Sequence, residues 1–176
     1  MPRPPKPLDL EGLMNYAART LAGRAQSLSE LRDKLRRRAA VKSDVDQVLA
    51  RLKDAGFLND KKFAESYANW RRDDGGFGKA RVMHDLMVRR VAPGLARQAA
   101  DTAFSEADEI AMIEKFLARK YRGKDLGKML TEEKHLASAY RKLRGAGFSS
   151  GNSIRVLKRY AAEAERLEEM EERSEE

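Results

Sequence analysis

Few side chains of this chain have the types and spacing that covalent chemistry requires. Histidine is the usual general base near neutral pH and a common metal ligand, and the chain has only two, His84 and His135. They lie far apart, each in an expected helix, so we interpret them as surface or half-buried helical residues. The Asp-Asp-Gly-Gly sequence at 73–76 has no third carboxylate at the spacing of a magnesium loop, and it favours a turn at a helix end.

Other catalytic patterns are missing from the sequence. The chain has no cysteine, which excludes disulfides and thiolate metal sites. It contains no glycine-rich phosphate loop before a Lys-Ser or Lys-Thr pair and no nucleophile elbow. We therefore expect a protein that is not an enzyme, with no catalytic residues, no cofactor and no metal.

Positive charge is the stronger indication of function. The 176 residues carry a formal net charge of +8, but residues 163–176 hold eight acids and two bases, so residues 1–162 carry +14. A surplus of this size favours a polyanionic partner, whereas any single basic residue is as easily explained as a solvated helix face. The candidate contacts are Arg32, Arg36, Arg37, Arg71, Arg72, Lys79, Arg81, Arg89, Arg90, Arg141, Lys142, Arg144, Arg155 and Lys158.

The elements that must position these charges are helices. Alanine and leucine far outnumber valine, isoleucine and threonine, and four of the five prolines lie in the first seven residues. This balance predicts an all-α fold with no sheet. Ser27 and Glu30 form a capping box, and Pro93 stands where a helix can begin. Further helix starts are expected at Asp9, Ser43, Asn59 or Asp60, Lys79, Ser105, Thr131 and Ser153, and helix ends at Gly23, Gly56 and Gly147.

Apolar residues at helical spacing predict the core. Phe63, Tyr67 and Trp70 fall at i, i+4 and i+7 and are interpreted as one core stripe. Phe77, between two glycines, is either an exposed anchor for a partner or, as we favour, a plug at the junction of two repeats. The principal core residues are expected to be Leu31, Leu35, Phe63, Tyr67, Leu86, Leu143, Phe148 and Ile154.

An internal repeat underlies this pattern. Pairs of helices joined by a short turn recur at 27–55, 78–104 and 131–160, and each is preceded by another helix. We predict an elongated rod of three tandem three-helix repeats, because a unit this small buries little surface without its neighbours. The expected parts are a flexible basic Pro-rich tail (1–8), three repeats (9–58, 59–104 and 105–162) and an acidic end, helical or disordered (163–176).

These residues resemble the RecX family. The most specific part is Asp60-x-x-Phe63-Ala64-x-x-Tyr67 with the basic helix downstream, and similar stretches lie at 27–35 and 142–148. Family members often have a glycine between the last two helices of each repeat. In this chain Ala40 and Arg90 stand at that position in the first and second repeats, and only the third repeat has the glycine, Gly147. The loop at 123–130 also looks longer than usual.

The resemblance implies a partner and a role. It implies a three-repeat helical rod that lodges in the groove of the RecA–DNA filament and inhibits filament extension, strand exchange, ATP hydrolysis and coprotease action. The protein would thereby regulate recombinational DNA repair and the SOS response. It would be a cytoplasmic monomer with no membrane contact, and direct binding to single- or double-stranded DNA stays open.

Two other classes of function remain as alternatives. The helix pairs resemble helix-turn-helix units, so a stand-alone DNA-binding repressor is one. The second helices of these pairs carry few bases, which disfavours it. A general helical adaptor for an acidic protein is the other.

Overall fold

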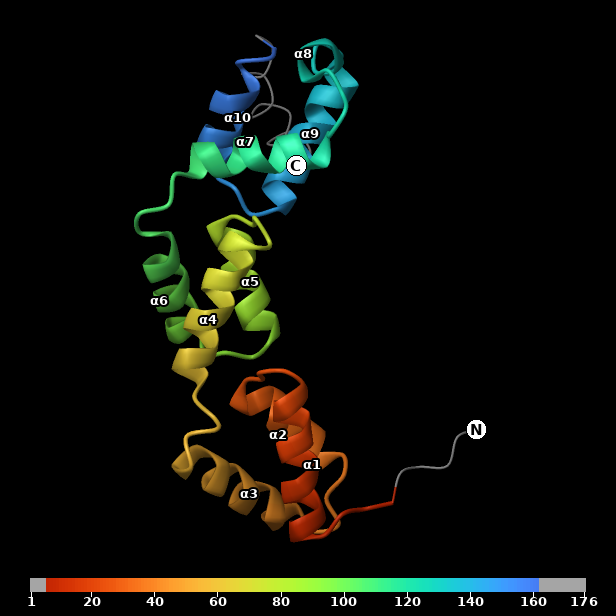
Figure 1. Cartoon of the computed structure of the whole chain (residues 1–176), viewed down its shortest axis with the longest axis vertical. Helices are drawn as coiled ribbons and strands as arrows, with labels where there is room; N and C mark the ends of the chain where they lie inside the picture. The colour runs from red at the N-terminus through yellow and green to blue at the C-terminus, as the bar shows by residue number, and fades with distance from the viewer. Residues whose placement is uncertain (1–5, 162–176) are drawn as a thin grey trace, which may run out of the picture. The chain divides into compact units, whose positions relative to one another are not determined.

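A computed structural model of the chain describes residues 6–161, and every regular element in that range is a helix (Figure 1). An isolated parallel bridge joins Leu8 to Ala39, and no strand is formed by the described residues. The all-α prediction is confirmed for this range. None of its helices is long and apolar enough to cross a membrane. The helices are α1 (Leu10–Gly23), α2 (Leu28–Arg36), α3 (Lys42–Asp54), α4 (Asp60–Asp73), α5 (Lys79–Val88), α6 (Pro93–Phe104), α7 (Glu109–Lys120), α8 (Leu126–Met129), α9 (Glu133–Gly145) and α10 (Ser150–Leu157).

Several helix starts follow the capping signals of the sequence. At α2, the Ser27 hydroxyl accepts a hydrogen bond from the Glu30 N–H at 3.1 Å, and the Ser27 N–H donates to the Glu30 carboxylate at 3.2 Å. The Asp9 carboxylate caps α1, and α6 begins at Pro93. The capping box and both of these starts are confirmed, because each rests on contacts within one turn.

Three predicted helix starts were wrong by two to four residues. The chain caps α7 with Asp108 rather than Ser105, since the Asp108 side chain accepts from the third N–H of that helix. α9 begins two residues after Thr131. α10 is capped by Ser149, and Ser153 lies inside it, donating its hydroxyl hydrogen to the Ser149 carbonyl.

The chain divides into two compact units. Unit 1 comprises Met1–Tyr67 with Asp85–Ala99, and unit 2 comprises Ala68–His84 with Ala100–Glu176. In unit 1, helices α1, α2 and α3 pack on one another, and in unit 2, α10 packs on both α7 and α9. The apolar cluster of unit 1 consists of Leu13, Ala17, Leu31, Leu35, Val45, Val48, Leu49, Leu52 and Leu58. That of unit 2 consists of Ile113, Leu117, Tyr121, Leu130, Leu136, Ala139, Tyr140, Leu143, Ala146, Phe148, Ile154, Val156, Leu157 and Ala161.

Most of the predicted core residues are buried. Leu31, Leu35, Leu86, Leu143 and Phe148 are fully buried, and Phe63 and Ile154 nearly so. Tyr67 is only half-buried.

Trp70 corrects the predicted aromatic stripe. Its side chain is 51% exposed, so placing it in the core was wrong. The fully buried positions of α4 are Ala64 and Ala68. At about 100° per residue, Trp70 lies more than a third of a turn away from the face that they define.

The ends of the chain bear on two further predictions. Leu8, in the predicted tail, donates its N–H to the Arg38 carbonyl at 2.7 Å and accepts from the Ala40 N–H at 2.8 Å. Its backbone is therefore paired. The acidic end predicted at 163–176 lies outside the described residues.

Candidate functional site

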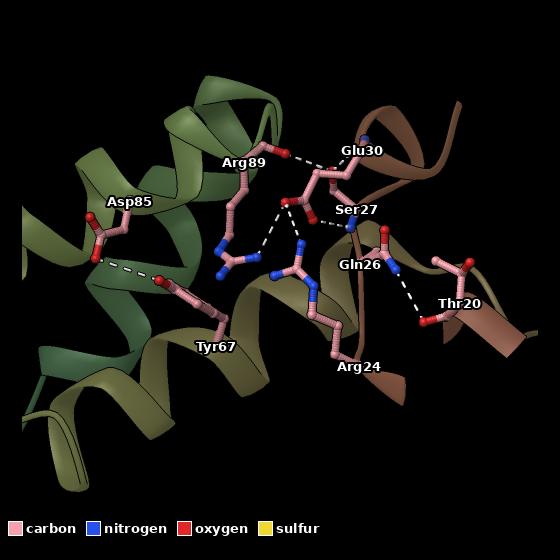
Figure 2. A network of polar contacts seen from close by, with 8 residues as sticks. All are labelled: Thr20, Arg24, Gln26, Ser27, Glu30, Tyr67, Asp85 and Arg89. Atoms are coloured by element: carbon pink, nitrogen blue, oxygen red, sulfur yellow. Dashed lines mark hydrogen bonds and ion pairs between the residues drawn. The ribbon is translucent and has the colours of Figure 1, made fainter. Parts of the chain in front are cut away.

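A polar network surrounds the start of α2 in unit 1 (Figure 2). The Glu30 carboxylate pairs with two guanidinium groups, Arg24 at 3.4 Å and Arg89 at 3.2 Å. The Ser27 hydroxyl, which accepts in the capping box, donates its own hydrogen to the Arg89 carbonyl at 2.6 Å. Arg89, the residue after α5, thus contacts both capping residues of α2, Ser27 through its carbonyl and Glu30 through its guanidinium. The Arg89–Glu30 pair is partly shielded from water, since these side chains are 25% and 18% exposed, whereas Arg24 is 50% exposed.

The family-like motif at 60–67 completes this network. The Asp60 carboxylate accepts a hydrogen bond from the Leu28 N–H at 2.7 Å, so an acid from α4 serves the amino end of α2, where negative charge is favourable. Phe63 stacks on the Tyr67 ring with centroids 5.9 Å apart. The Arg89 guanidinium lies 4.7 Å from the centroid of Tyr67. These three residues of the most specific motif therefore take part in contacts within unit 1.

Arg90 occupies a position where the family resemblance leads one to expect glycine. Its φ is +58°, the only positive φ of a non-glycine residue in the part of the chain described. Its guanidinium pairs with Asp33 of α2 at 2.6 Å. This departure from the family pattern therefore keeps the left-handed backbone of a glycine and adds an ion pair, whereas Ala40 has no positive φ.

In unit 2, the turn between α9 and α10 crosses the start of α5 at close range. The Gly78 N–H donates to the Ala146 carbonyl at 2.8 Å, and the Ala80 N–H donates to the Gly147 carbonyl at 3.2 Å. Gly147 has a φ of +90°. A Cβ on Gly147 would lie 2.2 Å from the Arg81 nitrogen, so only glycine fits.

Glu109 of α7 holds the amino end of α10. Its carboxylate accepts from the Ser149 N–H at 2.8 Å, from the Ser149 hydroxyl at 2.5 Å and from the Asn152 side-chain amide at 2.5 Å. Partial burial raises the pKa of Glu109, but these hydrogen bonds and the nearby Arg144 outweigh burial and lower the pKa overall.

The acidic and histidine candidates do not form a reactive group. Asp73 binds the Arg72 guanidinium, which lowers the pKa of the carboxyl, and Asp74 is exposed. His84 is exposed, and His135 Nδ1 lies 3.3 Å from Glu132. Residues 6–161 contain no group of three or more metal-ligating acids or histidines.

Four of the predicted basic contacts are engaged in internal ion pairs. Arg89 and Arg90 pair with α2 in unit 1, as described above. In unit 2, Arg72 binds Asp73 and also donates to the Ala103 carbonyl, and Lys79 binds Asp101 at 2.7 Å. Their charges are therefore partly neutralised within the fold.

The other predicted basic contacts vary in exposure. Arg32 and Arg71 are half-buried, and the Arg71 guanidinium lies 3.9 Å from the ring centroid of Phe77. The basic candidates of the predicted second repeat belong to different units. Arg89 and Arg90 lie in unit 1, whereas Arg71, Arg72, Lys79 and Arg81 lie in unit 2. Eight further predicted contacts are exposed: Arg36, Arg37, Arg81, Arg141, Lys142, Arg144, Arg155 and Lys158.

Comparison with known proteins decides the family. A family model described as the second three-helix domain of RecX matches residues 59–99, within the predicted second repeat. The Regulatory protein RecX of Amycolatopsis mediterranei is 30% identical over 157 residues, which cover 85% of each chain. The chain belongs to the RecX family. The RecX protein of Trichlorobacter lovleyi is also 30% identical, over 62% of this chain and 71% of its own.

Solved RecX structures share the fold. The crystal structure of RecX from Lactobacillus salivarius superposes with a TM-score of 0.63 at 21% identity, covering 86% of this chain and 96% of that one. Another RecX crystal structure gives 0.59 at 18% identity. The chain is therefore an all-α member of a family whose relatives are named regulatory proteins.

Proposed function

We propose that this RecX family member binds RecA and its filament on DNA, and that binding inhibits filament extension, strand exchange, ATP hydrolysis and coprotease action. The observation that carries the proposal is the similarity to RecX over 85% of both chains. A binding mechanism needs no reactive group, and it makes the basic helix faces the source of affinity.

Exposed cations of α9 and α10 are the best probes of this surface. Arg141 and Arg155 both belong to unit 2, are solvent-exposed, and have no carboxylate partner among the described residues. Arg89 is unsuitable as a probe, because reversing its charge would place two acids side by side at Glu30. Arg81 is unsuitable too, since its backbone packs against Gly147.

The test is RecA ATPase on single-stranded DNA, titrated with wild-type protein and with the variant Arg141→Glu plus Arg155→Glu. We expect the variant to need at least tenfold more protein for half inhibition. The matched control is Lys61→Glu plus Lys62→Glu, the same charge change at exposed positions in the first turn of α4. Equal inhibition by all three proteins would contradict the assignment of this surface to RecA.

A further inference from the structure

The positive charge of the chain is concentrated in one part of unit 2. Residues 9–58 carry ten bases and seven acids, and residues 59–104 carry nine bases and six acids, so each range has a surplus of three positive charges. Residues 109–161, which include α7 to α10, carry thirteen bases and five acids, a surplus of eight. Ion pairs within this last range therefore cannot neutralise it.

The end of the described chain presents this charge to solvent. The exposed residues between 152 and 161 are all basic: Arg155, Lys158 and Arg159. Of these, Arg159 pairs with Glu114 of α7. Ala161 is buried in the apolar cluster of unit 2, and its N–H donates to the Leu157 carbonyl at 3.0 Å. The chain thus leaves unit 2 from a fixed point, directly after a basic surface.

The residues that follow carry the opposite charge. Residues 163–176, the acidic end, hold eight acids and two bases, so six negative charges stand against the surplus of eight in 109–161. Fourteen residues span up to about 46 Å when extended, whereas α9, with its 13 residues, is about 20 Å long. The acidic end can therefore reach any exposed cation of α9 or α10. Because it is tethered, its effective concentration at these helices is in the millimolar range, and a weak attraction is enough for binding.

We propose that the acidic end binds the exposed cations of α9 and α10 and covers this basic surface until an anionic partner displaces it. Exposed ion pairs are individually weak and are screened by salt, so the cover is reversible. The contact itself does not depend on RecA, whereas its effect on inhibition rests on the proposed function. A partner that uses this surface would have to compete with residues 163–176 for it.

Two full-length variants with the same change in net charge separate this contact from a general effect of charge. The acidic-end variant carries four substitutions: Glu168→Gln, Glu169→Gln, Glu171→Gln and Glu172→Gln. The matched control removes four exposed acids outside the range 109–176: Glu11→Gln, Asp46→Asn, Asp54→Asn and Asp74→Asn.

Energy transfer between two dyes tests the contact directly. The chain has no cysteine, so Gly151→Cys plus Ser174→Cys provides two unique labelling sites, one in α10 and one in the acidic end. Transfer should fall by about a third or more between 20 mM and 1 M NaCl, because the Debye length shrinks to about 3 Å at 1 M. The acidic-end variant should show the lower transfer at both salt concentrations. Transfer that does not change with salt in the protein with the native acidic end would overturn the proposal.

A free anionic peptide tests whether the surface is covered. Fluorescein-labelled decaglutamate should bind the acidic-end variant about fivefold more tightly than the matched control at low salt, because the control keeps its own acidic end on the cations. Equal affinity for the two variants would overturn the proposal. In the RecA ATPase assay, the acidic-end variant should reach half inhibition at a lower concentration than the control. If the wild-type protein does not inhibit RecA, the proposed function fails, and the dye and peptide measurements still decide this inference.

Discussion

Gly147→Ala should be among the most destabilising single-methyl changes in unit 2. Gly147 has a φ of +90°, which costs a residue with a Cβ roughly 1–2 kcal/mol. The added methyl carbon would also lie 2.2 Å from the Arg81 nitrogen and 2.5 Å from the Arg81 Cβ. These atoms belong to the first turn of α5, so the clash cannot be relieved by rotating a flexible side chain.

The expected loss of stability follows from the two segments that the added methyl group would push apart. Separating α5 from the α9–α10 turn would weaken two backbone hydrogen bonds, from Gly78 to the Ala146 carbonyl and from Ala80 to Gly147, worth about 1 kcal/mol each. Together with the backbone strain, we expect a loss of about 3–4 kcal/mol in the free energy of unfolding. For a chain of 176 residues, that loss corresponds to roughly 6–16 °C in Tm.

The measurement is urea and thermal unfolding followed by circular dichroism. Gly151→Ala is the matched control, because Gly151 is exposed in α10 and an added Cβ there meets nothing within 4 Å. The control should be as stable as wild type or more stable by about 0.5 kcal/mol, since alanine favours helix. A Gly147→Ala protein within about 1 kcal/mol of wild type would refute this packing argument.

Two ionic contacts give further predictions. Glu109→Gln should cost about 1–2 kcal/mol at pH 7, because the carboxylate accepts three hydrogen bonds at a partly exposed site. The folded state lowers the pKa of Glu109 below its ordinary value of 4.5, so its contribution is complete above that pH and is lost as pH falls through the folded pKa. Wild type and variant should therefore converge in urea unfolding at acid pH, and a constant difference would contradict the pKa assignment. Glu30→Gln keeps the capping geometry but removes the charge facing Arg24 and Arg89, so it should cost about 1–2 kcal/mol in 50 mM NaCl and less in 1 M NaCl. A cost that does not change with salt would show that the pairing charge is unimportant.

Features set within one turn of helix could be predicted from the sequence. Ser27 and Glu30 form the expected capping box, and Gly56 and Gly147 have the positive φ expected of helix ends. Helix starts were misplaced where several polar residues compete for one role, as at Ser105, where Asp108 three residues later is the cap that forms.

Long-range partners could not be predicted. Nothing in the sequence pairs Arg89 with Glu30, which lies 59 residues away, or Lys79 with Asp101. The number of basic residues in the second repeat therefore overstates the positive charge that this repeat can present to a partner, because four of them form internal ion pairs.

Regulation of RecA through binding to its filament is the function that we propose for this chain. The most direct measurement is the rate of ATP hydrolysis by RecA on single-stranded DNA during titration with the wild-type protein. We expect inhibition at fewer than one molecule per RecA monomer, with no effect on an unrelated DNA-dependent ATPase on the same DNA. An unchanged rate at molar excess over RecA would contradict it, as would equal inhibition of both enzymes, which would indicate simple competition for DNA.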